Sequence, residues 1–261
     1  MEDNMRPMKP VGRYKTAYTI PNRDVDFMKR LRPGAMFGYF QDIASLHSEN
    51  IGTGVARLAN DFGVAWVLMR MRVDILRTPM LYEEITLATW PMVDSRILYD
   101  RDFTLADASG EVIVRGSSAW ILMDLEKREI VKEKLFDYLT ADFPSERALT
   151  EKPGRVRMPS SGKKIFDRSV TYSDTDYNGH MNNTKYIDVM MDSIGMDTLR
   201  ESTPASIEVN YSREIRPGET LTLYKDDSLF ETGRAIYADV RGAGNENLFT
   251  GKIVLRNSES G

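Results

Sequence analysis

The pattern of apolar and polar residues divides the chain into two similar blocks, each with an extended segment, one helix and a run of strands. In the first block, residues 13–20 have the composition of a strand, and residues 33–47 carry apolar side chains at the spacing of an amphipathic helix. Five residues form this apolar face: Met36, Tyr39, Phe40, Ile43 and Leu46. Ile51 and Gly52 are expected to end the helix.

Strands are predicted after each helix. In the first block they are residues 64–76, 84–90, 97–106 and 112–123, with one of the turns between them at Asp94 and Ser95. The second block has a strand at 164–172, a helix at 183–194 that stops at Gly195, and strands at 206–215, 220–225, 234–240 and 248–255. Ile194 and Gly195 recur 143 residues after Ile51 and Gly52, which indicates an internal duplication.

One helix followed by an antiparallel meander, made twice, predicts two sheets that each wrap around their own helix. Each sheet would leave an exposed edge, and pairing the two sheets within the chain removes it. The expected fold class is therefore α+β, built as an internal pseudo-dimer. We assign residues 1–125 to the first half, 126–162 to a linker and 163–261 to the second half.

The linker and the strand after it form a local basic patch on an acidic protein. Six cations lie there against Glu151 and Asp167: Lys152, Arg155, Arg157, Lys163, Lys164 and Arg168. One interpretation is an ordinary solvated linker. The other is a docking surface for an acidic protein, centred on Lys163, Lys164 and Arg168, because complementary fields favour association.

Composition excludes several kinds of chemistry. The chain has no cysteine, so it has no disulfide, no thiolate metal site and no cysteine nucleophile. Its two histidines, His47 and His180, are far apart in sequence, and we predict no metal and no other cofactor. A net charge of −4 argues against nucleic acid as a partner.

Hydropathy also bears on location. No stretch of the sequence approaches the roughly 20 apolar residues of a membrane helix, so no membrane association is expected. The first residues are too polar for a secretory signal, which predicts a cytoplasmic protein.

Chemistry-bearing residues gather between a predicted strand and the second helix. Asp176, Asn178 and His180 surround Gly179 in a run that ends at the start of the helix. Helix N-termini stabilise negative charge, so a carbonyl held there would be polarised for attack. Asp176 would act as nucleophile or general base, and the other two would orient the carbonyl or a water.

Each member of this run has a purely structural alternative. Asp174 or Asp176 would then be turn residues whose carboxylates accept from the following backbone amides, and Asn182 or Asn183 would cap the helix. Gly179 would serve only a turn with positive φ.

The run Asp176-x-Asn178-x-His180-x-Asn182-Asn183-x-x-Tyr186 resembles the motif of the acyl-acyl-carrier-protein thioesterases of plants and bacteria. Residues 40–54 resemble the N-terminal helix of that family, and residues 211–215 resemble its Tyr-Arg-Arg-Glu-Cys segment. The resemblance spans nearly the whole chain and implies the double hotdog fold. It implies catalytic roles for Asp176, Asn178 and His180, with Glu214 matching a further acid.

Ile215 departs from the family pattern, because some plant members carry a cysteine there that was proposed as a nucleophile. Attack by water or a carboxylate is what the residues permit, with Asp176 or Glu214 as base and His180 as positioner or proton carrier. Alternation along residues 206–214 would instead put Glu214 on a solvated strand face.

The first half is expected to lack catalytic activity, because neither His47 nor residues 22–28 has an acid–amide–histidine cluster. Its expected task is to accommodate the substrate. Side chains assigned to substrate binding are Trp66, Met69, Met71, Met36 and Phe40, which suit an acyl tunnel, together with Asn182. Ordinary core packing is the alternative for the first five.

The resemblance implies hydrolysis of fatty acyl thioesters on acyl carrier protein, which ends fatty-acid synthesis, with acyl carrier protein as partner. An acyl-coenzyme A thioesterase is the nearest rival. A hotdog dehydratase and a non-catalytic acyl-binding module are further alternatives. The sequence leaves open whether a homodimer forms on top of the internal duplication.

Overall fold

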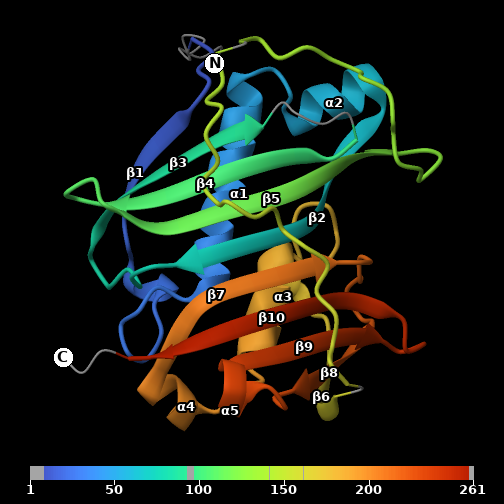
Figure 1. The fold of residues 1–261 in the computed structure, drawn as a ribbon. Helices are drawn as coiled ribbons and strands as arrows, with labels where there is room; N and C mark the ends of the chain where they lie inside the picture. Colours follow the sequence, from blue (N-terminus) through green and yellow to red (C-terminus); the bar gives the residue numbers. More distant parts are fainter. Residues whose placement is uncertain (1–8, 93–96, 141, 161, 259–261) are drawn as a thin grey trace.

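Ten strands form one continuous sheet in the computed structural model, in the order β1-β3-β4-β5-β2-β7-β10-β9-β8-β6 (Figure 1). The structure describes residues 9–92, 97–140, 142–160 and 162–258. The predicted turn at Asp94 and Ser95 and residues 1–8 lie outside that part of the chain.

The first half follows the predicted order of a strand, a helix and a meander. Its elements are β1 (Tyr14–Thr19), the 3-10 helix η1 (Asn22–Asp24), α1 (Pro33–Asn50), α2 (Val55–Phe62), β2 (Val64–Ile75), β3 (Glu84–Met92), β4 (Tyr99–Asp107) and β5 (Val112–Asp124). Pro33 starts α1, where its missing N–H costs nothing, and Gly52 follows the helix with φ of 77°.

The second half repeats the same plan. Its elements are β6 (Lys163–Ser169), the 3-10 helix η2 (Tyr172–Asp174), α3 (Asn183–Met191), α4 (Met196–Glu201), β7 (Ser202–Tyr211), β8 (Thr220–Asp226), α5 (Phe230–Gly233), β9 (Ala235–Gly242) and β10 (Asn247–Asn257). The second helix is shorter than predicted, because α3 ends at Met191 and Gly195 caps the separate helix α4.

Antiparallel pairing of β2 with β7 joins the two halves, from Arg70 opposite Asn210 to Asp74 opposite Ser206. Only β1 and β6 are left at the ends of the sheet. The predicted internal pairing of two meanders is therefore confirmed, and it leaves two strand edges where separate halves would leave four.

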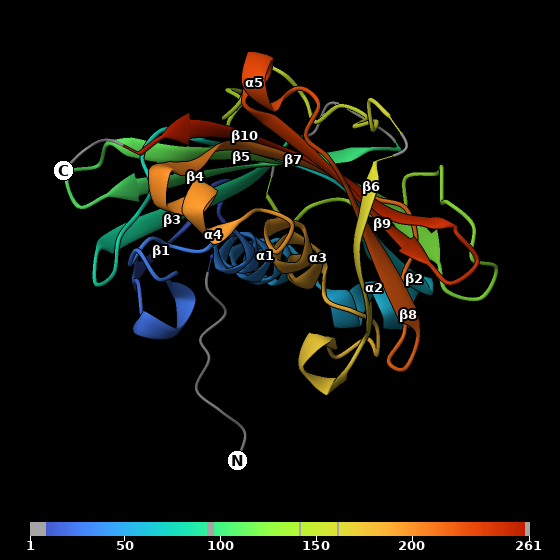
Figure 2. The same ribbon diagram turned by 90° about the horizontal axis from the view of Figure 1, so that it is seen from below.

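Both long helices lie on one face of the sheet, and Figure 2 shows α1 and α3 side by side beneath its curve. They are antiparallel and close, because a Cβ on Gly34 would lie 2.1 Å from the Asp188 carboxylate and one on Gly38 would lie 3.8 Å from Thr184. A glycine at position 34 allows this approach.

The predicted core face of α1 is confirmed for Met36, Tyr39, Phe40 and Ile43, which are all buried. Leu46 was wrongly placed in the core, since 47% of its surface is exposed. One residue later on the helix, about 100° further round, His47 points inward and is fully buried.

The linker crosses the outer face of the sheet, opposite the helices (Figure 1). Side chains of the strands accept hydrogen bonds from its backbone amides: Val156 donates to Asn210 over 2.5 Å, Gly154 to Glu208 over 2.6 Å and Ala148 to Asp102 over 2.7 Å. The linker is thus bound along its length by outward-facing polar residues, which differs from a freely solvated segment.

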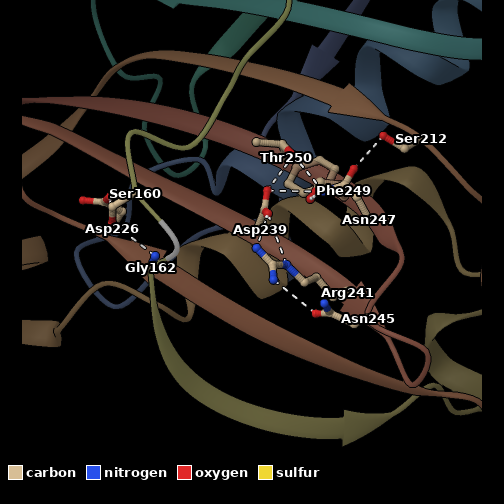
Figure 3. A network of polar contacts seen from close by, with 10 residues as sticks. All are labelled: Ser160, Gly162, Ser212, Asp226, Asp239, Arg241, Asn245, Asn247, Phe249 and Thr250. Carbon is tan, nitrogen blue, oxygen red and sulfur yellow. Dashed lines mark hydrogen bonds and ion pairs between the residues drawn. The ribbon is translucent and has the colours of Figure 1, made fainter.

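Polar side chains on the outer face of the second half form a network around Asp239 (Figure 3). Its carboxylate accepts from Thr250 over 2.6 Å and pairs with Arg241 over 3.1 Å. At the end of the linker, Ser160 donates to Asp226 on β8. Hydrogen bonding to Ser160 and Ser228 holds the pKa of Asp226 at about 2, so this anchor stays ionised at neutral pH.

Candidate active site

The loop from Val170 to Asn182 connects β6 to α3 and is fixed at its start by Asp174. The Asp174 carboxylate accepts from the Thr171 amide over 2.9 Å and pairs with Arg168 over 2.7 Å. Burial alone would raise the pKa of Asp174, but these bonds outweigh it and hold the pKa below its usual value. Asp174 is therefore a structural residue of the turn.

A tight turn at residues 176–180 presents the predicted catalytic run. The Asp176 carboxylate accepts from the Asn178 amide over 2.8 Å, and the Asp176 amide donates to the His180 carbonyl over 2.9 Å. Gly179 has φ of 77°, which a side chain would resist. The turn leaves Asn178 exposed and His180 partly buried.

His180 lies close to an acid from the segment that follows β7. Its Nε2 lies 3.5 Å from Glu214 Oε2, with exposed side-chain fractions of 21% and 43%. The same Glu214 oxygen accepts from Arg128 over 2.9 Å. Arg128, from the turn after β5, was not predicted, and nothing in the sequence signals a contact across 86 residues.

Glu214 reaches His180 because β7 ends at Tyr211. Beyond it, the amides of Ser212 and Arg213 both donate to the Leu248 carbonyl, over 2.9 and 3.3 Å. Two consecutive amides on one acceptor break the alternation of the strand. Glu214 therefore lies beyond the strand that the alternation assumed, and its side chain is 43% exposed, as the solvated alternative expected.

The structure brings His180 and Glu214 together but gives Asp176 a different environment. Among the described residues, the polar contacts of the Asp176 carboxylate are with its own turn, through Asn178. Asp176 and Asn178 thus precede His180 closely in sequence, while Glu214 is the acid in contact with it.

Helix α3 begins directly behind this group. Asn182 caps it by accepting from the Thr184 amide over 2.9 Å, as the structural alternative for this residue predicted. Its own amide donates to the Asp174 carbonyl over 2.8 Å, which ties the helix start to the turn. The nine-residue helix therefore directs the positive end of its dipole toward the loop that carries His180.

An apolar pocket of the first half lies beside the start of α3. It is lined by Phe37, Phe40, Gln41, Leu68, Met71, Phe103, Trp120, Asn183, Thr184 and Tyr211. Its volume is about 10 Å³, room for about one water, so an acyl chain would have to displace side chains to enter. Phe40 and Met71, which were assigned to an acyl tunnel from the sequence, both line this pocket.

Three other residues assigned to substrate binding lie elsewhere. Trp66 donates to the Thr53 carbonyl over 3.0 Å and packs on Tyr99 under α2. Met36 lines a separate cleft at the start of α1. Met69 lies at a register irregularity between Leu68 and Arg70, which turns Leu68 and Met71 toward the pocket instead.

The three cations assigned to docking lie on the edge strand β6. Lys163 and Lys164 are exposed. Lys164 pairs with Asp167 over 2.6 Å, and Arg168 pairs with Asp174 over 2.7 Å. Neighbouring acids therefore offset part of the positive charge of this patch.

His47 is a buried structural residue in the first half. Its Nε2 lies 2.8 Å from the Val11 carbonyl, and its Nδ1 lies 2.9 Å from the Arg101 guanidinium. Burial, and then the Arg101 charge, lower the pKa of His47 to about 4, so the ring is neutral and accepts from Arg101. Tyr14 stacks on it at 5.7 Å.

The described residues contain no group of three or more histidine, aspartate and glutamate side chains arranged to hold a metal ion. In the same part of the chain, no helix has the length and apolar character needed to cross a bilayer.

Two helix-wrapping meanders in one sheet, with a polar cluster at the start of the second helix, define a double hotdog protein. Sequence profiles of the acyl-ACP thioesterase N-terminal and C-terminal domains match residues 12–137 and 160–254. The chain belongs to the acyl-ACP thioesterase family.

Known proteins of this family are similar over most of the chain. Oleoyl-acyl carrier protein thioesterase 2, chloroplastic, of Arabidopsis thaliana is 27% identical over 78% of this chain, which spans 60% of that protein. The oleoyl-acyl carrier protein thioesterase of Coriandrum sativum is 25% identical, and the chain spans 59% of it. The chain thus covers about three fifths of these relatives.

Solved structures agree in fold. An acyl-ACP thioesterase from Bacteroides thetaiotaomicron superposes with a TM-score of 0.84 and 25% identity, covering 94% of this chain and 98% of that one. The 12:0-ACP thioesterase of Umbellularia californica gives 0.82 at 19% identity, with 94% of both chains covered, which bears on the fold alone.

Proposed function

We infer that the protein hydrolyses fatty acyl thioesters of acyl carrier protein, releasing a free fatty acid and the carrier thiol. The observation that carries this proposal is the contact of His180 with Glu214, 3.5 Å apart, at the start of α3 and near an apolar pocket. Family membership and the names of the relatives, which act on oleoyl-carrier substrates, support the substrate class.

In the proposed reaction, Glu214 takes a proton from a water that attacks the thioester carbonyl carbon. Asn178 orients the carbonyl or the water. The N-terminal end of α3 stabilises the negative charge that develops on the carbonyl oxygen. The C–S bond then breaks, and the proton that Glu214 took passes through His180 to the leaving thiolate, which returns both residues to their starting state. No covalent enzyme intermediate is needed.

Asp176 has two candidate roles, and one substitution separates them. As a turn residue it only has to accept from the Asn178 amide, which an asparagine oxygen also does. As a nucleophile it needs the carboxylate. Asp176→Asn should therefore keep most activity if Glu214 is the base, whereas loss of activity comparable to His180→Ala would assign the attack to Asp176.

The test of hydrolysis is release of free thiol from saturated acyl-carrier substrates of increasing chain length. Wild type should release thiol, and His180→Ala should lose at least about 100-fold in kcat, typical of losing an acid–base group. A dehydratase releases no thiol, and a non-catalytic acyl-binding module binds without turnover. Either outcome would overturn the proposal.

Carrier-protein preference is the finer part of the proposal, and acyl-coenzyme A is its rival. Reversing the exposed Lys163 and Lys164 to glutamate, with Arg168 kept because it pairs with Asp174 at the start of the loop, should impair hydrolysis of the carrier-bound ester far more than that of the coenzyme A ester. Lys15→Glu on β1, the opposite end of the sheet, is the matched control. Equal impairment of both esters would argue against carrier docking on β6.

We further propose a role in ending fatty-acid synthesis in the cytoplasm. The plant relatives are named as chloroplastic proteins. Fractionation of the cells that produce this protein tests its compartment. Formation of an external homodimer stays open and is measured by sedimentation.

A further inference from the structure

The loop before α1 has the same backbone hydrogen bonds as the catalytic loop before α3. The bond from residue 26 to residue 30 is 2.8 Å, and that from 176 to 180 is 2.9 Å. The Asp26 carboxylate accepts from the Met28 amide over 2.8 Å, as Asp176 accepts from Asn178. The first half thus retains the scaffold of a second site.

The side chains on this scaffold differ from the hydrolytic ones. Arg30 occupies the place of His180. The Leu31 amide donates to Pro79 as the Met181 amide donates to Ile215, so Thr78 occupies the place of Glu214. A site with arginine and threonine there lacks the histidine–glutamate pair, so it can bind a ligand without hydrolysing it.

A cleft opens at this second scaffold. Its volume is about 480 Å³, within the range of small-molecule pockets. Loop 26–32, the start of α1, the end of α3, α4 and the start of β7 enclose it. Its walls are mainly aliphatic and methionine side chains, among them Met36, Ile75, Met191, Ile194, Leu199 and Pro204.

The rim of the cleft exposes large apolar side chains to solvent. Phe27 of the loop is 46% exposed and Met196 of α4 is 51% exposed. Flexible methionines and an exposed aromatic rim suit an alkyl chain.

The charges of the cleft differ between its two sides. On the loop side, Arg30 is already occupied by Asp26 and by the carbonyls of Leu199 and Ser202, at 2.9, 2.8 and 3.1 Å. The Arg32 guanidinium donates to the Arg23 carbonyl and has no acidic partner among the described residues.

Arg32 also stands at the N-cap of the 18-residue helix α1, where the helix dipole favours an anion. The acids Asp188 and Asp192 line the α3 side of the cleft, and Asp188 approaches Gly34 in the first turn of α1 and pairs with Lys185 over 3.5 Å. Arg32 is thus the lining cation without an acidic partner in the described part of the chain, and an anionic head is placed there, with its chain directed between the helices.

We propose that this cleft is a second lipid site, which binds a long-chain fatty acid with its carboxylate on Arg32 and its chain among Met36, Met191 and Leu199. The site is separate from the hydrolytic residues, and binding there does not depend on turnover.

Labelling locates the ligand. Palmitate with a photoreactive diazirine on its chain is irradiated with the full-length protein, and the labelled peptides are mapped by mass spectrometry. Labels are expected in residues 188–204 and around Met36. Labels confined to the pocket of Phe40, Leu68 and Met71 would overturn the proposal.

Titration tests the carboxylate contact. Laurate binding is measured by calorimetry with wild type, Arg32→Glu and the control Arg23→Glu, whose side chain is 80% exposed and lies outside the cleft lining. We expect Arg32→Glu to weaken binding at least about tenfold and Arg23→Glu to leave it within about twofold. Equal effects would refute the contact.

Met196→Glu adds a charge at the exposed rim and serves as a second variant with little risk to folding. It should weaken laurate binding while thiol release from acyl-carrier substrate stays at the wild-type rate. Unchanged binding in Met196→Glu would argue against a chain in this cleft. Loss of thiol release in wild type would instead bear on the proposed hydrolysis alone.

Discussion

Acidification should destabilise the protein through His47. The ring is fully buried and neutral, and it accepts from Arg101, so protonation would place two cations 2.9 Å apart in the core. The pKa of His47 falls from 6.5 to about 4 on folding, which corresponds to about 3 kcal/mol of stability.

The sign follows from proton uptake. The unfolded chain binds a proton at His47 below about pH 6.5, whereas the folded chain does so only below about pH 4. The contribution of His47 is therefore fully present above pH 6.5 and is lost as the pH falls through this window.

Two measurements test this. The chain has only two histidines, so NMR titration gives two imidazole signals, and His180→Gln assigns them. Urea unfolding at pH 7 and pH 4.5 then compares wild type with His47→Gln, whose amide can donate to Val11 and accept from Arg101. The pH-dependent loss should shrink in His47→Gln and persist in His180→Gln. A His47 signal titrating near pH 6.5 would refute the reasoning.

Three further predictions concern the scaffold, each measured against wild type. Asn182→Ala removes the cap of α3 and should lower the free energy of unfolding in urea by about 1 kcal/mol, and an unchanged free energy would show that the cap is dispensable. Gly34→Ala brings a methyl against Asp188 and should destabilise the protein, and Asp188→Ala should relieve this in a double-mutant cycle; additive effects would contradict the contact. Asn210→Ala frees Val156 and should speed limited proteolysis of the linker, whereas an unchanged rate would show that the linker is held by other contacts.

Much of the fold could be predicted because burial repeats with the period of each element. The apolar positions of α1 recur at helical spacing, and the strands alternate between core and surface. Helix α2 escaped prediction although Val55, Leu58 and Phe62 recur at helical spacing, because eight residues are too few for the period to stand out from a short apolar run. His47 escaped because its partners, Val11 and Arg101, are distant in sequence.

The residues of the candidate site also differ in whether the sequence alone could reveal them. His180 and its turn are local, so sequence spacing and a glycine with positive φ were sufficient to locate them. The partner acid is not local, because Glu214 reaches His180 only where β7 stops, and Arg128 comes from the turn after β5. The lining of the pocket depends on an irregularity in β2 that no alternation rule predicts, which is why Met69 was assigned in place of Leu68.

The sequence identified residues 22–28 as the corresponding loop of the first half, but not the hydrogen bonds that the two loops share. What repeats between residues 26–32 and 176–182 is the set of backbone bonds, while His180 and Arg30 share no chemistry. Duplication preserved the turn and let its side chains diverge.

The proposed hydrolysis requires His180 and Glu214 to act together, and the rate of thiol release from acyl-carrier substrate in Glu214→Gln tests this most directly. Glutamine keeps the shape of the side chain but cannot take a proton from water. We expect a fall of at least about 100-fold in kcat with little change in KM, matching His180→Ala and leaving Asp176→Asn active. Wild-type kcat in Glu214→Gln would contradict the account.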